Sequence, residues 1–216
     1  MAHKQPYIII GMHRSGTSLV AKVLEKAGIF MGVIKDHNYE AMHFLSLNQQ
    51  TLWAAGASWL DPKVPAREFY RTIPEHELYR EHFRLNTSFQ KLANSLKKPD
   101  WGWKDPRNTF TLAMWLEMFP QAKVIHVFRN GEEVAKSLRK RNNKPGEVHD
   151  SRLNDMEFNL ALWDKYLQQA RSFQGLGHRF LEINYTDIVS GNAEAIGKLE
   201  KFCNRKLVGL FAKYVR

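Results

Sequence analysis

A short hydrophobic segment, Tyr7–Ile10, runs directly into a glycine-containing loop, Gly11–Gly16. The run Tyr-Ile-Ile-Ile is typical of a buried strand. After the loop, apolar residues recur at helical spacing, which predicts a helix from Thr17 to Ala27 that ends before Gly28. Free backbone N–H groups and the positive end of the helix dipole bind anions at such a point. The sequence therefore predicts an anion site between a strand and a helix.

This loop differs at one position from the nucleotide-binding pattern G-x-x-x-x-G-K-[ST]. Gly11, Gly16 and Ser18 fit the pattern, but Thr17 stands where the pattern has lysine. Enzymes that transfer a γ-phosphoryl group place that lysine on the β- and γ-phosphates. Here the nearby cation is Arg14, inside the loop. The loop is therefore suited to hold a phosphate and poorly equipped to transfer one.

Length and charge narrow the class of protein further. The chain has 216 residues and a net charge of +10, from 32 Lys and Arg against 22 Asp and Glu. The length suits one α/β domain, which we expect to span residues 1–216, and the charge favours an anionic partner. A single cysteine, Cys203, excludes an internal disulfide and indicates a reducing compartment. No apolar run approaches the roughly 18–20 residues of a membrane span, so we expect a cytoplasmic protein.

The rest of the chain alternates between predicted strands and helices. Strands are expected at 101–104, 123–128 and 180–183, and helices at 40–55, 109–119, 132–139, 156–170, 192–202 and in the C-terminal tail. A long amphipathic helix is expected to start at Pro74 and to carry Leu78, His82, Leu85, Phe89, Leu92 and Leu96. The segment 139–152 is expected to be an exposed basic loop. The alternation predicts an α/β fold with three layers, in which helices cover both faces of a central, mostly parallel sheet like that of P-loop nucleotide hydrolases.

Three segments of the chain resemble the sulfotransferases that use 3′-phosphoadenosine-5′-phosphosulfate (PAPS). Arg14-Ser15-Gly16-Thr17-Ser18 is similar to their 5′-phosphosulfate loop, and Thr111–Leu138 resembles the region of their 3′-phosphate site. Lys104-Asp105-Pro106 is similar to a lysine segment of the tyrosylprotein and bacterial-type members. The resemblance implies PAPS as cofactor and PAP as product. The late Arg-Lys-Gly segment of the cytosolic steroid and phenol type is absent from the sequence.

The resemblance also implies a role for individual residues. It assigns the 5′-phosphosulfate to Arg14, Ser15, Gly16, Thr17 and Ser18 and the 3′-phosphate to Arg129, Ser137 and Arg141. Arginine and serine suit that task, because a guanidinium grips phosphate oxygens and a hydroxyl adds a neutral donor. For Arg129 and Arg141 the alternative is a salt-bridged surface arginine. Lys104 would face the transferring sulfonate, and Tyr185, in a late segment that resembles the family loosely, would lie along the nucleotide or pack in the core.

The residue that takes the acceptor's proton is harder to assign. Glu40 is the best candidate, because it follows the first predicted helix by a distance at which related enzymes place a catalytic glutamate. A glutamate favoured by the dipole at a helix start is the alternative for this position. The rival bases are His13, His37, His43 and Asp105.

The sequence thus favours an enzyme that moves a sulfonate from PAPS to a hydroxyl or amine, by in-line transfer and without a metal. The acceptor is a small molecule, carbohydrate, lipid or peptide, in a pocket shaped by 29–100 and the loop after Arg139, with Trp53, Trp59, Phe69 and Tyr70 as candidate contacts. A P-loop-type nucleotide kinase is the alternative; Thr17 and the lack of a convincing Walker B carboxylate count against it. Only the charge motivates nucleic-acid binding, and no recognised signature supports it.

Overall fold

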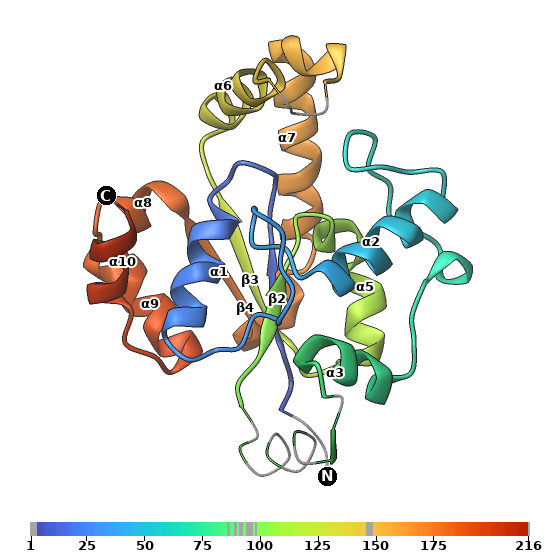
Figure 1. Cartoon of the computed structure of the whole chain (residues 1–216). Helices are drawn as coiled ribbons and strands as arrows, with labels where there is room; N and C mark the ends of the chain where they lie inside the picture. Colours follow the sequence, from blue (N-terminus) through green and yellow to red (C-terminus); the bar gives the residue numbers. More distant parts are fainter. Residues whose placement is uncertain are drawn as a thin grey trace.

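Four parallel strands form the centre of the molecule. The computed structural model describes residues 4–85, 87–88, 90, 93, 97, 99–145 and 149–215. Within these ranges the sheet has the order β2-β1-β3-β4, and each neighbouring pair is parallel. The strands are β1 (Tyr7–Ile10), β2 (Gly102–Lys104), β3 (Lys123–Phe128) and β4 (Phe180–Asn184). They all end at the same edge, which is the upper edge in Figure 1.

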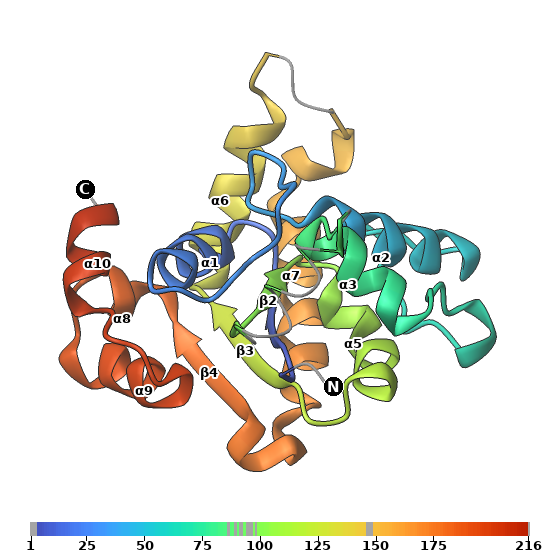
Figure 2. The same cartoon turned by 60° about the horizontal axis from the view of Figure 1, so that its bottom comes forward.

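Helices cover both faces of the sheet, as Figures 1 and 2 show. One face carries α1 (Thr17–Lys26), α8 (Tyr185–Val189), α9 (Ala193–Cys203) and α10 (Val208–Tyr214). The other carries α2 (Met42–Ala54), α3 (Glu75–Phe83), α5 (Asn108–Met118) and α7 (Met156–Arg171). A further helix, α6 (Gly131–Asn142), lies above the carboxyl ends of the strands. Short 3₁₀ turns occupy Arg67–Phe69, Ser151–Asn154 and Gln174–Arg179. This arrangement confirms the expected three-layer α/β fold.

The two central strands, β1 and β3, send alternate side chains into two separate cores. Ile9, Ile125 and Val127 pack with α1 and α9 on one face, whereas Ile8 and Ile10 face the opposite core. In that second core the Phe44 and Trp103 rings stack with centroids 3.9 Å apart. Burial on both faces explains why the strands are hydrophobic throughout rather than alternating.

The helix expected to continue beyond residue 83 ends there instead. Arg84 adopts a left-handed backbone conformation with φ 52°, and the N–H of Leu85 donates to the carbonyl of Arg80 at 2.9 Å. A left-handed residue followed by this hydrogen bond is a common C-terminal cap, because it satisfies a carbonyl of the last helical turn. The apolar spacing that favoured a longer helix includes Phe89, Leu92 and Leu96, which lie outside the described residues.

Helix α6 is longer than the predicted segment 132–139, and it includes part of the expected basic loop. Its apolar face, formed by Val134, Ala135 and Leu138, is buried in the core beneath α7. The Asn142 side chain then donates to the carbonyl of Asp150 at 3.0 Å and to Asn154 Oδ1 at 3.2 Å. These contacts hold the last turn of α6 in place, so positions 139–142 are helical rather than a loop.

Candidate active site

The loop between β1 and α1 has backbone conformations that require its two glycines. Gly11 has φ 134°, and a Cβ there would lie 2.2 Å from the carbonyl oxygen of Val127. Gly16 has φ 92°, and a Cβ there would lie 1.9 Å from the ring of Tyr185. Only glycine combines such backbone angles with so close an approach. The loop is therefore packed directly against β3 and α8.

Thr109 fixes the start of this loop. The N–H of Gly11 donates to the Thr109 hydroxyl at 3.0 Å. Thr109 lies in the first turn of α5, which begins at Asn108, and its buried hydroxyl holds the loop in place.

The polar side chains of the loop differ in their surroundings. Arg14 is exposed, and its Nε donates to Ser137 Oγ at 3.0 Å, so the loop is joined to α6. Ser18 donates to the carbonyl of Asn38 at 2.6 Å. Ser15 is buried, and its hydroxyl has no hydrogen-bond partner within the described part of the chain. Because buried hydroxyls normally have a partner, this orphan fits a loop that completes its hydrogen bonds on a bound ligand.

A cleft runs along the carboxyl ends of the strands, where ligands of open α/β sheets bind. The strand order sets the order of the side chains: Lys104 ends β2, the anion loop follows β1, Arg129 follows β3 and Tyr185 follows β4. Its lining contains most of the residues that the sequence predicted, namely Arg14, Gly16, Thr17, Ser18, Glu40, Lys104, Arg129, Arg141 and Tyr185. Ser15 and Ser137 are outside the lining, although Ser137 touches Arg14.

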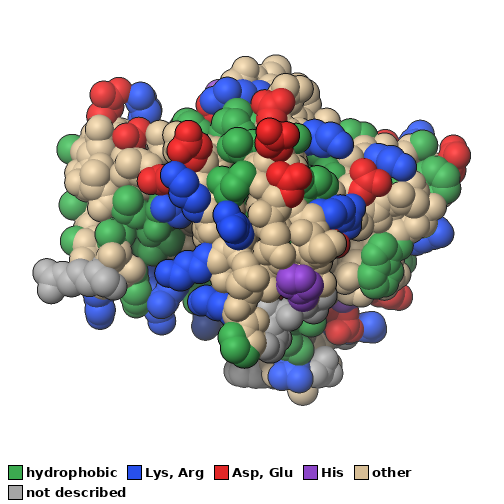
Figure 3. Space-filling model, turned by 90° about the horizontal axis from the view of Figure 1, so that it is seen from above, with side chains coloured by type: hydrophobic (Ala, Val, Ile, Leu, Met, Phe, Trp, Pro, Cys, Tyr) green, Lys and Arg blue, Asp and Glu red, His purple; other side chains and the backbone are tan. Residues whose placement is uncertain are grey.

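The surface around the cleft is rich in cations. Seen from above, Lys and Arg side chains lie across the middle of this face and toward the side that carries α8 and α10 (Figure 3). Acidic side chains are interspersed among them. A cleft with this surrounding attracts anionic ligands.

At one end of the cleft Arg129 and Tyr185 form a stack. The guanidinium of Arg129 lies 4.9 Å from the centroid of the Tyr185 ring, and its Nε donates to Glu133 Oε2 at 2.8 Å. Tyr185 in turn packs on Gly16. The half-buried Tyr185 therefore joins the anion loop to Arg129, whereas the sequence left open whether it belongs to the core.

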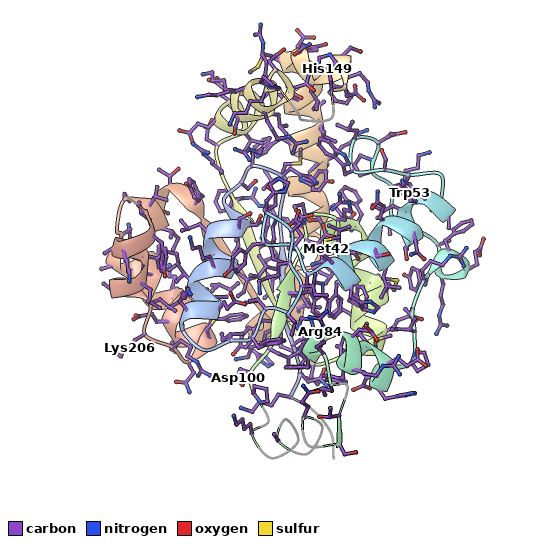
Figure 4. All side chains as sticks on the ribbon, in the orientation of Figure 1. Met42, Trp53, Arg84, Asp100, His149 and Lys206 are labelled. Carbon is purple, nitrogen blue, oxygen red and sulfur yellow. The ribbon has the colours of Figure 1, made fainter. Side chains whose placement is uncertain are left out.

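Arg141 lies against a different neighbour. Its guanidinium is 5.3 Å from the Trp59 ring centroid, and the His13 ring is 4.6 Å from the same indole. Of the aromatic residues expected near the acceptor, Trp59 thus borders the cleft residues His13 and Arg141. The Trp53 side chain is 61% exposed, and Figure 4 shows it at the far end of α2. Trp53, Phe69 and Tyr70 are all outside the lining of the cleft.

Lys104 and Glu40 form a buried ion pair. Lys104 Nζ donates to Glu40 Oε1 at 2.9 Å and to the carbonyl of Asn38 at 3.1 Å. Glu40 precedes α2, which begins at Met42, so the reading of Glu40 as a helix-start glutamate does not describe its contacts. Burial and the nearby Asp105 raise the pKa of Glu40, against the lowering effect of Lys104 and Arg107. The side chain most favoured as base is therefore held next to the candidate catalytic lysine.

The rival bases are placed less favourably, with one exception. His37 is exposed, and Asp105 is fully buried outside the cleft lining. His43 lies on α2, also outside the lining. His13 does line the cleft, and burial together with nearby arginines and Lys104 holds its pKa well below the usual range. His13 is therefore neutral, and it remains the second candidate.

Two groups that contact the candidate site residues were not predicted from the sequence. Arg107 donates to Glu40 Oε2 at 3.1 Å, and the Asn38 carbonyl accepts from both Ser18 and Lys104. The run Lys104-Asp105-Pro106-Arg107 offered a signal for the arginine, because three charged residues cluster at the end of one buried strand. A backbone carbonyl such as that of Asn38 leaves no signal in a sequence.

The protein is an α/β protein with an open parallel sheet. Its glycine-containing loop and the cations at the carboxyl edge of the sheet form a cleft of the kind that binds phosphate groups. The family model described as "Sulfotransferase family" matches residues 6–207 of the chain. The chain therefore belongs to the sulfotransferase family, whose members are PAPS-dependent transferases. A search of curated proteins found no match.

Solved sulfotransferase structures share the fold at low sequence identity. STF1 from Mycobacterium tuberculosis H37Rv superposes with a TM-score of 0.54 and 14% identity, over 99% of this chain and 71% of that one. The sulfotransferase domain of the Synechococcus PCC 7002 olefin synthase superposes with a TM-score of 0.52 and 18% identity, over 95% of this chain and 76% of that one. Mouse SULT7A1, solved with PAP, superposes with a TM-score of 0.58 and 13% identity, over 100% of this chain and 65% of that one. Within the described residues, no helix combines the length and apolarity required to cross a membrane.

Proposed function

We propose that this protein transfers the sulfonate of PAPS to a hydroxyl or amine group of an acceptor, without a metal ion. The observation that carries the proposal is the series of groups in the cleft, in which Lys104, the anion loop, Arg129 and Tyr185 follow the strand order. This series offers cations for two phosphate groups and one further cation for the transferring group. Family membership supports the same cofactor.

The cofactor would be held by the residues that the sequence predicted. Ser15, Gly16, Thr17, Ser18 and Arg14 would hold the 5′-phosphosulfate on the loop. Arg129, Ser137 and Arg141 would hold the 3′-phosphate, with Tyr185 along the nucleotide. The fit rests on the orphan hydroxyl of Ser15 and on the cationic groups that converge on the cleft. Mouse SULT7A1, which shares the fold, was solved with PAP.

PAPS, when bound, supplies a sulfonate already activated as a mixed anhydride with phosphate. In the proposed transfer, the bond from sulfur to the bridging oxygen would break as a bond from sulfur to the acceptor oxygen or nitrogen formed, and PAP would leave. Lys104 would place its charge where negative charge builds on the bridging oxygen, which is the strongest form of stabilisation a protein supplies. Arg14 would add charge at the loop.

Glu40 would take the proton that the acceptor releases. Its raised pKa suits this task, because a base works best when its pKa approaches the working pH. The ion pair between Lys104 and Glu40 supports this assignment, because it brings the two side chains together at the cleft. The acceptor's hydroxyl or amine would therefore enter beside Glu40, close to His13 and Trp59.

The test is calorimetry with PAP, ADP, ATP and a random oligonucleotide, each in the presence and absence of EDTA. We expect PAP to bind more tightly than ADP, since a 3′-phosphate adds contacts with Arg129 and Ser137, and EDTA to change nothing. Equal affinity for PAP and ADP would remove the basis for naming PAPS. Tight binding of ATP that requires Mg²⁺ would favour the kinase instead, and tight binding of the oligonucleotide a nucleic-acid function.

The acceptor and the setting belong to the same proposal. We propose an acceptor that is a small molecule, carbohydrate, lipid or peptide, with Trp59 and His13 as its nearest wall. One domain spanning 1–216 and a cytoplasmic location also remain proposals. The second rests on the single cysteine, Cys203, which is buried.

A further inference from the structure

Arg107 bridges two buried carboxylates. Its Nη1 donates to Glu40 Oε2 at 3.1 Å and to Asp105 Oδ1 at 2.9 Å. The side chains of Glu40 and Asp105 are 4% and 0% exposed, so water screens these contacts little. An uncompensated buried charge is costly, and each carboxylate therefore depends on the cation that it contacts.

Asp105 and Asn48 fix the position of Arg107 on the side away from the cleft. Asp105 Oδ1 also accepts from the backbone N–H of Arg107 at 2.9 Å, and Asp105 Oδ2 accepts from Asn48 Nδ2 at 2.9 Å. Asn48 is itself held by the hydroxyl of Thr111 at 2.7 Å and by the indole of Trp115 at 2.8 Å. These hydrogen bonds fix Asp105, which in turn holds the Arg107 guanidinium in contact with Glu40.

The two cations that contact Glu40 have different tasks. Lys104 lines the cleft, and its charge is needed on the cofactor during transfer. Arg107 is outside the lining and is held by Asp105. Arg107 thus contacts Glu40 from outside the cleft, and this contact does not compete with a charge on the cofactor.

We propose that Arg107 is a positioning residue, which holds Glu40 in place and in its ionised form so that Glu40 accepts the acceptor's proton. Asp105 completes the device by fixing Arg107 and balancing its charge. The inference rests on the proposed function, because it takes Glu40 as the base.

The charged and titratable groups around Glu40 come from several elements. Burial and Asp105 raise the pKa of Glu40, and Lys104 and Arg107 lower it. The remaining groups that face this site are Asp36, whose carboxylate accepts from the Glu40 N–H, His13 of the anion loop, which is neutral, and Tyr166 of α7, whose pKa burial raises. Arg107 and Asp105 are both outside the cleft lining and are linked by an ion pair, so each can be changed without removing a side chain that lines the cleft.

The experiment measures the ionisation of Glu40 directly, so it needs no acceptor. Protein labelled with ¹³C at the glutamate carboxyls is titrated by NMR, with and without saturating PAP. The Glu40 signal is the one that disappears in Glu40→Gln. We expect Arg107→Gln to raise the titration midpoint of Glu40 by about 1–3 pH units, as expected for loss of an adjacent opposite charge. Asp105→Asn keeps an acceptor oxygen that can hold Arg107 and removes a neighbouring anion, so it should lower the midpoint.

Two further variants separate positioning from general structure. Arg107→Lys keeps the charge without the planar fork, so it should restore part of the shift. Arg67→Gln removes a comparable arginine from an exposed pair with Glu117, and it should leave the Glu40 midpoint unchanged. If Arg107→Gln fails to fold, the opposite shift in Asp105→Asn and the intermediate value in Arg107→Lys still test the proposal.

Two results would overturn the inference. One is a Glu40 midpoint that stays the same in all folded variants, and the other is a shift in the same direction for Arg107→Gln and Asp105→Asn. Calorimetry with PAP on the same wild-type sample tests the proposed function separately. Absent PAP binding with the expected shifts would reject the PAPS assignment and leave the Arg107–Glu40 coupling in place.

Discussion

At the scale of single residues, Lys104 and Glu40 share one contact, so a change in either side chain alters the surroundings of the other. Removal of Lys104 leaves Glu40 and Asp105 with Arg107 between them. Removal of Glu40 leaves Lys104, within the part of the chain that the structure describes, with the Asn38 carbonyl as its hydrogen-bond partner. Each variant should therefore be read for binding as well as for rate.

Lys104→Ala and Arg14→Ala should separate transfer from binding. Lys104 is expected to act mainly as charge builds on the bridging oxygen, so Lys104→Ala should lower kcat by about 10²-fold or more and change PAP affinity much less. Arg14 lies in the anion loop and should contribute to both, so Arg14→Ala should weaken PAP binding and slow the reaction. Calorimetry beside single-turnover kinetics measures the two effects. Normal binding and normal rates in both variants would place the anion site elsewhere.

Glu40→Gln keeps the shape of the side chain and removes its ability to take a proton. It should lower kcat by about 10²–10⁴-fold, the usual contribution of a positioned base, while PAP binding is unchanged. Since burial raises the pKa of Glu40, the wild-type rate should fall with decreasing pH at values above the ordinary carboxyl range. That acidic limb should vanish in Glu40→Gln. A variant that turns over at the wild-type rate would direct the search for the base to His13.

These residues differ in how far the sequence could locate them. Lys104 is the last residue of one recognisable strand and Arg129 directly follows another. Parallel strands bring their carboxyl ends to one edge of the sheet, so the presence of both side chains at that edge was predictable. Glu40 depends on the path of the segment between α1 and α2, which has no periodic pattern. Arg107 gains its partners through a turn after β2, and the sequence shows no spacing that predicts contact with Glu40.

At the scale of elements, the strand–loop–helix unit from β1 to α1 is held by packing outside itself. Tyr185 of α8 lies against Gly16, and Thr109 of α5 holds Gly11. The sequence predicted the unit because its strand and helix patterns are local. It did not predict these supports, because they come from residues about 100 positions or more away in the chain. The end of α3 and the length of α6 differed from expectation for a local reason, because the left-handed Arg84 and the contacts of Asn142 leave no periodic pattern in the sequence.

Gly16→Ala should disrupt this unit selectively. The added Cβ would lie 1.9 Å from the Tyr185 ring, on a backbone with φ 92°. We expect loss of PAP binding and a destabilisation of about 1–3 kcal/mol, in the range of strain at unfavourable backbone angles. The matched control is Gly197→Ala in α9, where a Cβ meets nothing within 4 Å and the helix should gain about 0.5–1 kcal/mol. Chemical denaturation and calorimetry measure both variants, and a Gly16→Ala protein that binds PAP normally would contradict the packing role.

At the scale of the whole molecule, stability and catalysis draw on different buried ionisable groups. The Lys104, Glu40, Arg107 and Asp105 cluster lies beside the cleft, and its two cations balance its two anions. His82 lies at the end of α3, with its ring edge-on to Phe44 and Phe30, and it is not among the groups that shift the pKa of Glu40. A mutation at His82 therefore changes the stability of the fold without touching the groups assigned to transfer.

His82 should make the fold sensitive to acid. Burial lowers the pKa of His82 from 6.5 to about 3, so between these values the unfolded chain binds a proton that the folded chain does not. The stability contributed by the neutral ring is present above pH 6.5 and is lost as the pH falls toward 3, by up to about 1.4 kcal/mol for each pH unit. His82→Phe cannot take up this proton, so its unfolding free energy should depend less steeply on pH between 6.5 and 4. The control His76→Phe replaces an exposed histidine in the first turn of the same helix and should keep the wild-type slope. Urea unfolding at several pH values measures the slopes, and equal slopes for wild type and His82→Phe would show that another group controls the acid response.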